Sequence, residues 1–215
     1  MCAEFDHFVR DALDFGAKYA AIASVADIIF NEEFRGMCEQ NTCGSYNKNW
    51  MCPPAVPPIN TFKENVLNFK QGLLVQTVHN IKSSFDWEGM MMAAETHTAI
   101  FRLILDRLEK DSNCQEILPL NAGPCTYCKR CTFLDSEPCR FPDKALTSVE
   151  ASGIDVMALE KVVEYPTTMA KILFPMLGSS YSEFNILLQG GDKRNLRTDN
   201  LDRFPIRLKE GCQRC

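Results

Sequence analysis

Residues 115–142 read QEILPLNAGPCTYCKRCTFLDSEPCRFP, which is a short apolar run followed at once by a cysteine-rich loop. The run from Gln115 to Leu120 has the length and apolar content of a buried strand. The loop after it contains four cysteines in a C-x2-C-x2-C-x7-C pattern: Cys125, Cys128, Cys131 and Cys139. Thiolates this closely spaced on a loop converge on one centre, so the pattern predicts a metal or cluster site beside the strand.

A second cysteine group lies upstream and forms a C-x4-C-x8-C-P-P pattern: Cys38, Cys43 and Cys52. The surrounding stretch, residues 31–58, is rich in asparagine, glycine and proline, and it reads as a loop. We interpret the three cysteines as ligands, with burial as small apolar side chains as the alternative. Tyr46 and Trp50 lie among them and are candidates either for shielding a cluster from solvent or for ordinary packing.

The other four of the 11 cysteines carry weaker signals: Cys2, Cys114, Cys212 and Cys215. Cys114 lies between a predicted helix and a predicted strand, and we expect a thiol without a ligand role. The C-terminal Cys212-Gln-Arg-Cys215 is either a mobile redox or metal-relay pair or has no role.

The expected cellular compartment bears on what the cysteines do. The first ten residues carry acids and His7 where a secretory signal would be basic and then apolar, and no run reaches the roughly 18 apolar residues of a membrane span. We therefore expect a cytoplasmic protein that does not enter a membrane. Because the cytosol keeps thiols reduced, clustered cysteines there indicate metal ligands or catalytic groups rather than disulfides.

Composition and motifs exclude several function classes. The net charge is −5 and the basic residues are scattered, so nucleic acid is not an expected partner. The sequence contains no phosphate-binding glycine loop, no nucleophile elbow and no paired metal-binding histidines. A redox partner protein is the expected partner, and the sequence predicts no oligomeric state.

Alternating apolar patterns predict both helices and strands along the chain. We expect helices over residues 4–20, 61–70, 86–110 and 155–164, with a short one opening at the capping box 147–150. We expect strands over residues 21–30, 73–78, 115–120 and 183–189. This order favours an α/β or α+β fold, a small mixed sheet flanked by helices with the two cysteine-rich loops at one edge. Residues 1–190 are expected to form a single metal-binding domain and residues 191–215 a polar tail.

The cysteine spacing favours an iron–sulfur cluster over zinc. Cys125, Cys128 and Cys131 match the first three ligands of the bacterial ferredoxin pattern, in which a fourth cysteine precedes a proline. Either Cys52, directly before Pro53, or Cys139 is the candidate fourth ligand. A zinc ribbon formed with Cys212 and Cys215 is the alternative, but it leaves one thiol of the triplet unused.

Three motifs in this order resemble a family of predicted metal-binding proteins of unknown function (domain of unknown function 2284): the cysteine run through Pro54, the run from Gly123 to Pro142, and residues 148–156. The resemblance covers roughly residues 20–190. It implies a cytosolic iron–sulfur protein found mainly in anaerobic microbes, with the seven cysteines as ligands and no settled substrate. Glu150 and Asp155 are motif members to which it assigns no role, and the tail ending at Cys215 departs from the usual pattern.

Three functions follow as hypotheses. The first is a redox protein that holds one or two [4Fe–4S] clusters on the seven cysteines and transfers electrons to a partner enzyme. The second is an enzyme, because seven ligands for two clusters leave one iron open to a substrate or to sulfur chemistry. The third is a structural zinc module that serves as an interaction platform.

Overall fold

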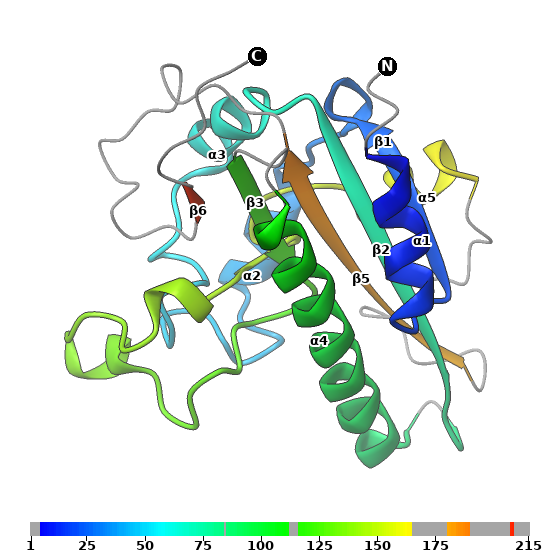
Figure 1. The fold of residues 1–215 in the computed structure, drawn as a ribbon. Helices are drawn as coiled ribbons and strands as arrows, with labels where there is room; N and C mark the ends of the chain where they lie inside the picture. The colour runs from blue at the N-terminus through cyan, green and yellow to red at the C-terminus, as the bar shows by residue number, and fades with distance from the viewer. Residues whose placement is uncertain (1–4, 84, 112–115, 165–179, 190–206, 209–215) are drawn as a thin grey trace.

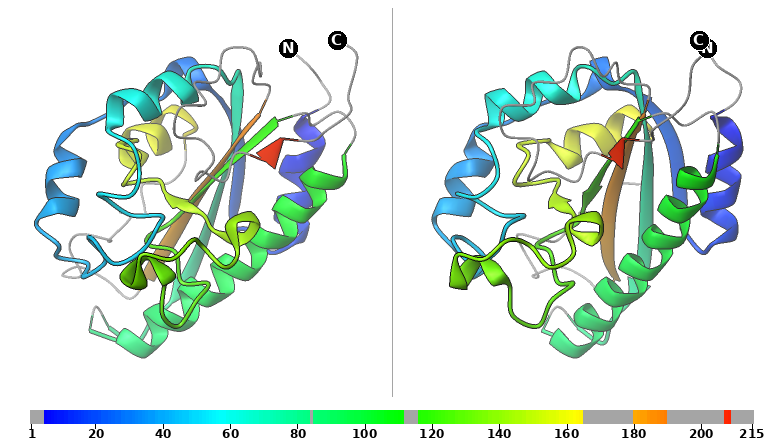
Figure 2. Two further views of the ribbon diagram at one scale, coloured as in Figure 1. Left: turned by 90° about the vertical axis from the view of Figure 1, so that its left-hand side faces the viewer. Right: turned by 60° about the vertical axis from the view of Figure 1, so that its left-hand side comes forward.

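The computed structural model describes residues 5–83, 85–111, 116–164, 180–189 and 207–208 of the 215-residue chain. Within these residues, a mixed β-sheet stands between two layers of helices (Figures 1 and 2). One face of the sheet is covered by α1 (Asp6–Asp14) and α4 (Trp87–Lys110). The other is covered by α3 (Ile59–Val66) and α5 (Val156–Val162), with α2 (Glu33–Glu39) on the same side. The predicted mixed sheet flanked by helices is confirmed, in the α+β class.

The strands lie in the order β1-β2-β5-β3-β4, and β6 pairs separately with β3. Their bounds are β1 Tyr19–Ser24, β2 Gln71–Asn80, β3 Glu116–Asn121, β4 Thr147–Ser148, β5 Ser180–Gln189 and β6 Arg207–Leu208. Only the β3–β4 pair among these strands is parallel. The last long strand in the sequence, β5, is therefore central and separates the β1–β2 half of the sheet from the β3–β4 half.

Each face of the sheet has its own apolar core, and β2 contributes to both. Leu74 packs with the α3 and α5 side chains, whereas Leu73 and Val75 pack with α1 and α4. Alternate side chains of a strand point to opposite faces, so a strand covered on both sides needs a continuous apolar run. This is why residues 73–75 read as unbroken hydrophobic sequence.

The long helix α4 starts where it was predicted, because the Asp86 side chain accepts a hydrogen bond from the Gly89 backbone N–H at 3.0 Å. Its C-terminal half supplies the buried stripe Phe101, Ile104, Leu105 and Leu108. The apolar residues of its N-terminal part are exposed instead of forming core: Trp87, Met91 and Met92 are 72 %, 41 % and 63 % exposed. Here the helix extends past the sheet it covers (Figure 1).

Two predicted elements are shorter than expected. The helix over residues 4–20 ends at Asp14, since Gly16 adopts a left-handed φ of 106° and the chain then enters β1. The strand over residues 21–30 stops at Ser24, whose side chain accepts a hydrogen bond from the Ala26 N–H and begins the 3₁₀ turn η1 (Val25–Asp27). β2 begins at Gln71, opposite Ser24, so no partner strand extends further.

The helix predicted at the capping box 147–150 is absent. Thr147 and Ser148 form β4, and a turn follows in which the Ser148 hydroxyl accepts a hydrogen bond from the Ala151 N–H. Gly153, at a φ of 77°, closes this turn, and α5 starts only after Asp155. The sequence signal therefore marked a single capped turn rather than a helix.

The two cysteine loops meet at the β3–β4 edge of the sheet, as predicted, but for another reason. Three antiparallel pairings separate β1 from β3, so these two strands run in opposite directions. The rule that sites gather at the carboxyl ends of parallel strands therefore does not apply. The loops meet because the stretch after α2 crosses to the second loop, beside which it lies in both views (Figures 1 and 2).

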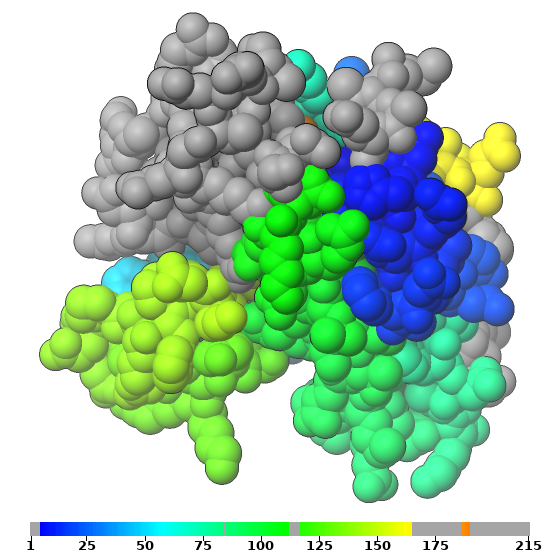
Figure 3. Space-filling model, viewed as in Figure 1, coloured from blue at the N-terminus to red at the C-terminus, as the bar shows by residue number. Residues whose placement is uncertain are grey.

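The second cysteine loop contains two 3₁₀ turns, η2 (Thr132–Asp135) and η3 (Pro142–Lys144). In the space-filling view this loop projects from the body of the protein next to α4 (Figure 3). No helix in the described ranges is long and apolar enough to cross a membrane. Of the predicted tail, only Arg207–Leu208 is described, as β6 on β3, and the proposed division at residue 190 stays a prediction.

Candidate metal centre

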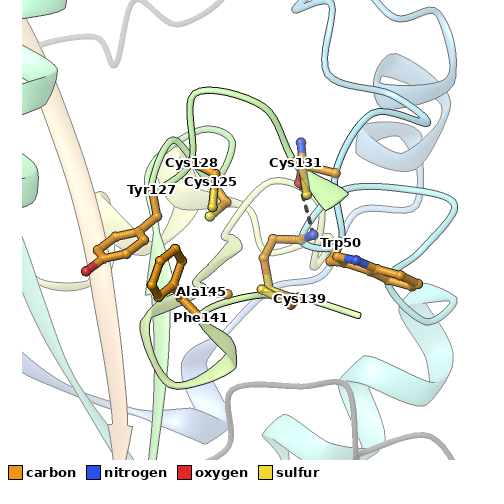
Figure 4. A pocket seen from close by; sticks show the side chains of 10 residues that line it. Trp50, Cys125, Tyr127, Cys128, Cys131, Cys139, Phe141 and Ala145 are labelled. Atoms are coloured by element: carbon orange, nitrogen blue, oxygen red, sulfur yellow. Dashed lines mark hydrogen bonds between the residues drawn. The ribbon is translucent and has the colours of Figure 1, made fainter. Parts of the chain in front are cut away.

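All four cysteines of the second group line one small cavity that is partly open to solvent. They are Cys125, Cys128, Cys131 and Cys139, called the tetrad below. Figure 4 shows the tetrad between the Tyr127 and Phe141 rings on one side and Trp50 on the other. The structure therefore groups Cys139 with the 125–131 triplet, which is one of the two alternatives that the sequence left open.

The walls of this cavity are aromatic. Tyr127 and Phe141 pack edge to face with ring centroids 5.0 Å apart, and the Arg102 guanidinium lies over the Tyr127 ring at 4.9 Å. On the opposite side, Trp50 packs edge to face against Phe133, also at 5.0 Å. Rings around a metal centre exclude water and lower the local dielectric, which tunes its potential. Tyr127 and Phe141 are 45 % and 44 % exposed, so this wall also faces solvent.

The charges of the tetrad cysteines act on one another, as the pKa of Cys139 shows. Burial raises the pKa of the Cys139 thiol, and the neighbouring thiolates Cys125, Cys131 and Cys128 raise it further. A hydrogen bond from the Phe141 backbone N–H acts against this and lowers the Cys139 pKa. Thiolates that repel one another in this way are stabilised by a positive charge at their centre, which a metal supplies.

The first cysteine group consists of three free thiols, Cys38, Cys43 and Cys52, called the triad below. Burial raises the pKa of Cys52 to about 12, and the charges of Cys43, Cys38 and Cys125 add to the increase. A side-chain hydrogen bond from Asn49 lowers it in part. Cys52 is 6 % exposed, whereas Cys43 is exposed, and Cys125 is the tetrad member whose charge acts on Cys52.

Cys38 is the triad member with charged neighbours from outside the cysteine groups. It lies on α2 rather than on a loop, which the sequence did not predict. Burial raises its pKa most, followed by the charges of Cys43 and Glu150, whereas Arg35 lowers it. The Arg35 guanidinium is fixed by donating to the Pro57 carbonyl at 3.1 Å.

Two contacts fix the loop of the triad, one to the loop of the tetrad and one to β4. The Trp50 indole N–H donates to the Glu137 carbonyl at 3.1 Å, across 87 residues of sequence. The Thr147 hydroxyl donates to the Met51 sulfur at 3.6 Å. Residues 50 and 51 directly precede Cys52, so these contacts fix the triad relative to the tetrad.

The donor set fits a soft or borderline metal, because all seven predicted ligands are free thiols. No group of three or more His, Cys, Asp or Glu residues in the described part of the chain is placed to hold a single metal ion. The tetrad thiols thus share a cavity without forming the closed ligand shell of one ion. Cys2, Cys114, Cys212 and Cys215 lie outside the described residues, and so does the predicted zinc ribbon with Cys212 and Cys215.

Sequence reasoning named Trp50 and the seven cysteines but missed several neighbours. Phe141 lies two residues after Cys139 and supplies both a ring and an N–H, and Asn49 supplies a hydrogen bond to Cys52. A polar or aromatic residue two or three positions from a ligand is a weak signal for such roles. Arg102 on α4 has no local sequence signal, since only the fold brings it to Tyr127.

Comparison with known proteins gives one match. A family model described as "Predicted metal-binding protein (DUF2284)" matches residues 21–177, which include all seven cysteines. No curated protein and no solved structure matches the chain.

Proposed function

This chain belongs to the DUF2284 family of predicted metal-binding proteins, and we propose that it is an iron–sulfur redox protein that transfers electrons to a partner protein. The observation that carries the proposal is the convergence of the four tetrad thiols on one cavity. Cys125, Cys128, Cys131 and Cys139 would hold a [4Fe–4S] cluster there, which supplies one-electron transfer. The triad would hold a second cluster.

Zinc is the competing metal. The spacing of Cys125, Cys128 and Cys131 supports the cluster instead, because a zinc ribbon uses pairs of cysteines and leaves one thiol of this triplet unused.

The surroundings of the tetrad suit electron exchange with a partner. The cluster would lie behind the Tyr127 and Phe141 rings, which are each nearly half exposed. A partner that docks on this wall comes close to the cavity without opening it. The Phe141 N–H that bonds to Cys139 is the kind of donor that raises a cluster's reduction potential by stabilising charge on sulfur.

Anaerobic purification with iron, acid-labile sulfide and zinc analysis tests the proposal. We expect brown protein with about four irons and four sulfides for each cluster, broad absorption at about 400 nm, and bleaching by dithionite. Colourless protein that contains zinc in a ratio of about one per chain, with no sulfide, contradicts the proposal and favours the structural zinc module.

A further inference from the structure

The loop that carries the tetrad exposes large apolar side chains. Tyr127, Leu134 and Phe141 are each nearly half exposed. The Tyr127 and Phe141 rings also line the tetrad cavity, so the same wall faces the thiols on one side and solvent on the other (Figure 4). The loop projects from the body of the protein in Figure 3, where a second protein can approach it. Exposed aromatic and apolar side chains on a projecting loop are typical of a protein–protein contact.

Basic side chains are in excess on this surface. Residues 125–145 contain four of them, Lys129, Arg130, Arg140 and Lys144, against the three acids Asp135, Glu137 and Asp143. Arg102 of α4, which lies over the Tyr127 ring, adds a fifth positive charge. The surface is therefore basic in a chain whose net charge is −5.

Two of the arginines are held by backbone carbonyls. The Arg102 guanidinium, 4.9 Å from the centre of the Tyr127 ring, donates to the Lys144 carbonyl at 3.1 Å. The Arg140 guanidinium donates to the Arg130 carbonyl at 3.0 Å. A carbonyl satisfies a donor but carries no net charge, so both guanidinium groups can still attract an anion. Because these groups are already ordered, a partner loses less conformational freedom when it meets them.

The other basic side chains differ in whether an acid neutralises them. Arg130 is paired with Asp135 at 2.5 Å. Lys129 and Lys144 are exposed, and within the described part of the chain neither forms an ion pair. The exposed wall of the tetrad cavity thus has an apolar centre with free positive charge around it.

An apolar centre with a charged rim is the anatomy of a transient contact, in which complementary charge steers the encounter. The charge that complements this rim is negative. A protein with a local acidic patch fits better than nucleic acid, because a chain of net charge −5 repels a long polyanion outside the rim. Resting on the proposed function, we infer that this wall, with Lys129 and Lys144 at its rim, docks an acidic electron-carrier protein. One electron then leaves the reduced tetrad cluster and enters the carrier; no bond breaks and no proton moves.

The competing role for these charges is compensation of the cluster, which its four thiolates make anionic. That role sets the reduction potential, so a change of charge alters the rate of oxidation by every acceptor in the same direction. Docking of an acidic partner has another signature, since positive charge at the rim attracts anionic acceptors and repels cationic ones. The ratio of the two rates separates the roles.

The test uses the full chain with its cluster reduced anaerobically by dithionite. Stopped-flow absorbance at about 400 nm follows reoxidation by ferricyanide, an anion, and by hexaammineruthenium, a cation, each of which accepts one electron. Poly-glutamate, which accepts no electron, competes as a model of an acidic protein surface. Duplex DNA at equal charge is the second competitor.

Charge reversal at the rim is compared with the same change elsewhere. K129E/K144E reverses two rim charges, and K129R/K144R keeps them. K18E/K70E is the matched control, because both lysines are exposed and directly precede β1 and β2, in the other half of the sheet.

We expect ferricyanide to oxidise the wild type faster at low than at high ionic strength, and hexaammineruthenium to do the reverse. K129E/K144E should lower the ferricyanide rate about tenfold at low ionic strength and raise the hexaammineruthenium rate. K129R/K144R and K18E/K70E should keep the wild-type ratio of the two rates. Poly-glutamate should slow oxidation by ferricyanide in the wild type more than in K129E/K144E.

Four results overturn the inference and leave the proposed function intact. The first is slower oxidation of the wild type by ferricyanide at low than at high ionic strength. The second is a change of both rates in the same direction in K129E/K144E, which assigns the charges to the cluster potential. The third is an equal change of the ratio in K18E/K70E, and the fourth is stronger competition by DNA than by poly-glutamate. Wild-type protein without a reducible cluster overturns the inference and the proposed function together.

Discussion

The indole N–H of Trp50 donates to the backbone carbonyl of Glu137 at 3.1 Å, and this bond connects the two cysteine loops. The same ring lines the tetrad cavity and packs on Phe133. Trp50 thus connects the triad, two residues before Cys52, to the segment that ends at Cys139. Its replacement should disturb both centres at once.

We predict that W50F, which keeps a ring but loses the N–H, lowers the free energy of unfolding by about 1 kcal/mol. Loss of this contact should also speed cluster bleaching by air or chelator about fivefold, because the loops separate more often. The measurement is the decay of absorbance at about 400 nm under a fixed oxygen concentration. W87F is the control, since Trp87 is 72 % exposed and does not line the tetrad cavity; equal decay rates in the two variants contradict the prediction.

Serine substitution of the two contested cysteines should affect different centres. C139S is expected to lose or alter the tetrad cluster, because Cys139 lines that cavity, and to leave the triad signal unchanged. C52S is expected to do the reverse, since Cys52 faces Cys38 and Cys43. Iron content and spin-resonance spectra of each variant report this, with C114S as the control that keeps both signals. Loss of the same signal in both variants contradicts the grouping.

We predict that Glu160 on α5 makes the free energy of unfolding depend on pH. Its side chain is fully buried, Oε1 accepts the Gln76 amide at 2.9 Å, and burial raises its pKa from 4.5 to about 7. The folded protein therefore holds a proton that the unfolded chain releases above about pH 4.5. Stability is then highest below that pH and falls as the pH rises to about 7, by about 3 kcal/mol in total.

E160Q should remove this part of the pH dependence, so that its unfolding free energy is flatter between pH 4.5 and 7 than that of the wild type. Urea denaturation at a series of pH values measures it. E95Q, at an exposed position of α4, serves as the control and should retain the wild-type slope. A wild-type slope in E160Q shows that Glu160 is not the group responsible.

We predict that a side chain larger than that of glycine at position 153 destabilises the protein. Gly153 adopts a φ of 77°, and a Cβ at this position would approach the Ile59 side chain to 2.8 Å. G153A is expected to lower the free energy of unfolding by about 1–3 kcal/mol through strain and overpacking. It should also disturb the turn that follows β4, which Gly153 closes.

G36A is the matched control for this change. Gly36 lies within α2, and no atom lies within 4 Å of a Cβ built there. Alanine should stabilise the helix by about 0.5–1 kcal/mol. Chemical denaturation curves of both variants check the opposite signs, and destabilisation of similar size in both argues against the role of Gly153.

The elements predicted best from sequence are those whose patterns are local. α4 was predicted to start at about Asp86 because the cap and the apolar stripe both lie within the segment, and β2 because its apolar run is continuous. The end of β1 at Ser24 was not predictable in this way, since it depends on where β2 begins. The helix predicted at the capping box 147–150 is absent because a side-chain hydrogen bond of the capping type, from the Ala151 N–H to the Ser148 hydroxyl, also stabilises a single turn.

For the candidate site, too, local sequence patterns predict some residues, and the rest depend on how distant segments come together. The spacing of the C-x2-C-x2-C run alone predicts that Cys125, Cys128 and Cys131 belong together, which are three of the four tetrad members. The assignment of Cys139 rather than Cys52 to it required the path of the second loop. The neighbours Arg102 and Glu137 come from distant segments, and no local pattern specifies such contacts.

The central position of β5 has a consequence for how the protein is made. The seven cysteines of the triad and the tetrad precede Ser180, the first residue of β5, so they are synthesised before the strand that joins the two halves of the sheet. The triad loop follows β1 and the tetrad loop follows β3, one in each half. Until β5 pairs with both β2 and β3, the two halves of the sheet are not joined to each other. The sheet that carries both cysteine loops is therefore joined only after all seven of these thiols have been synthesised.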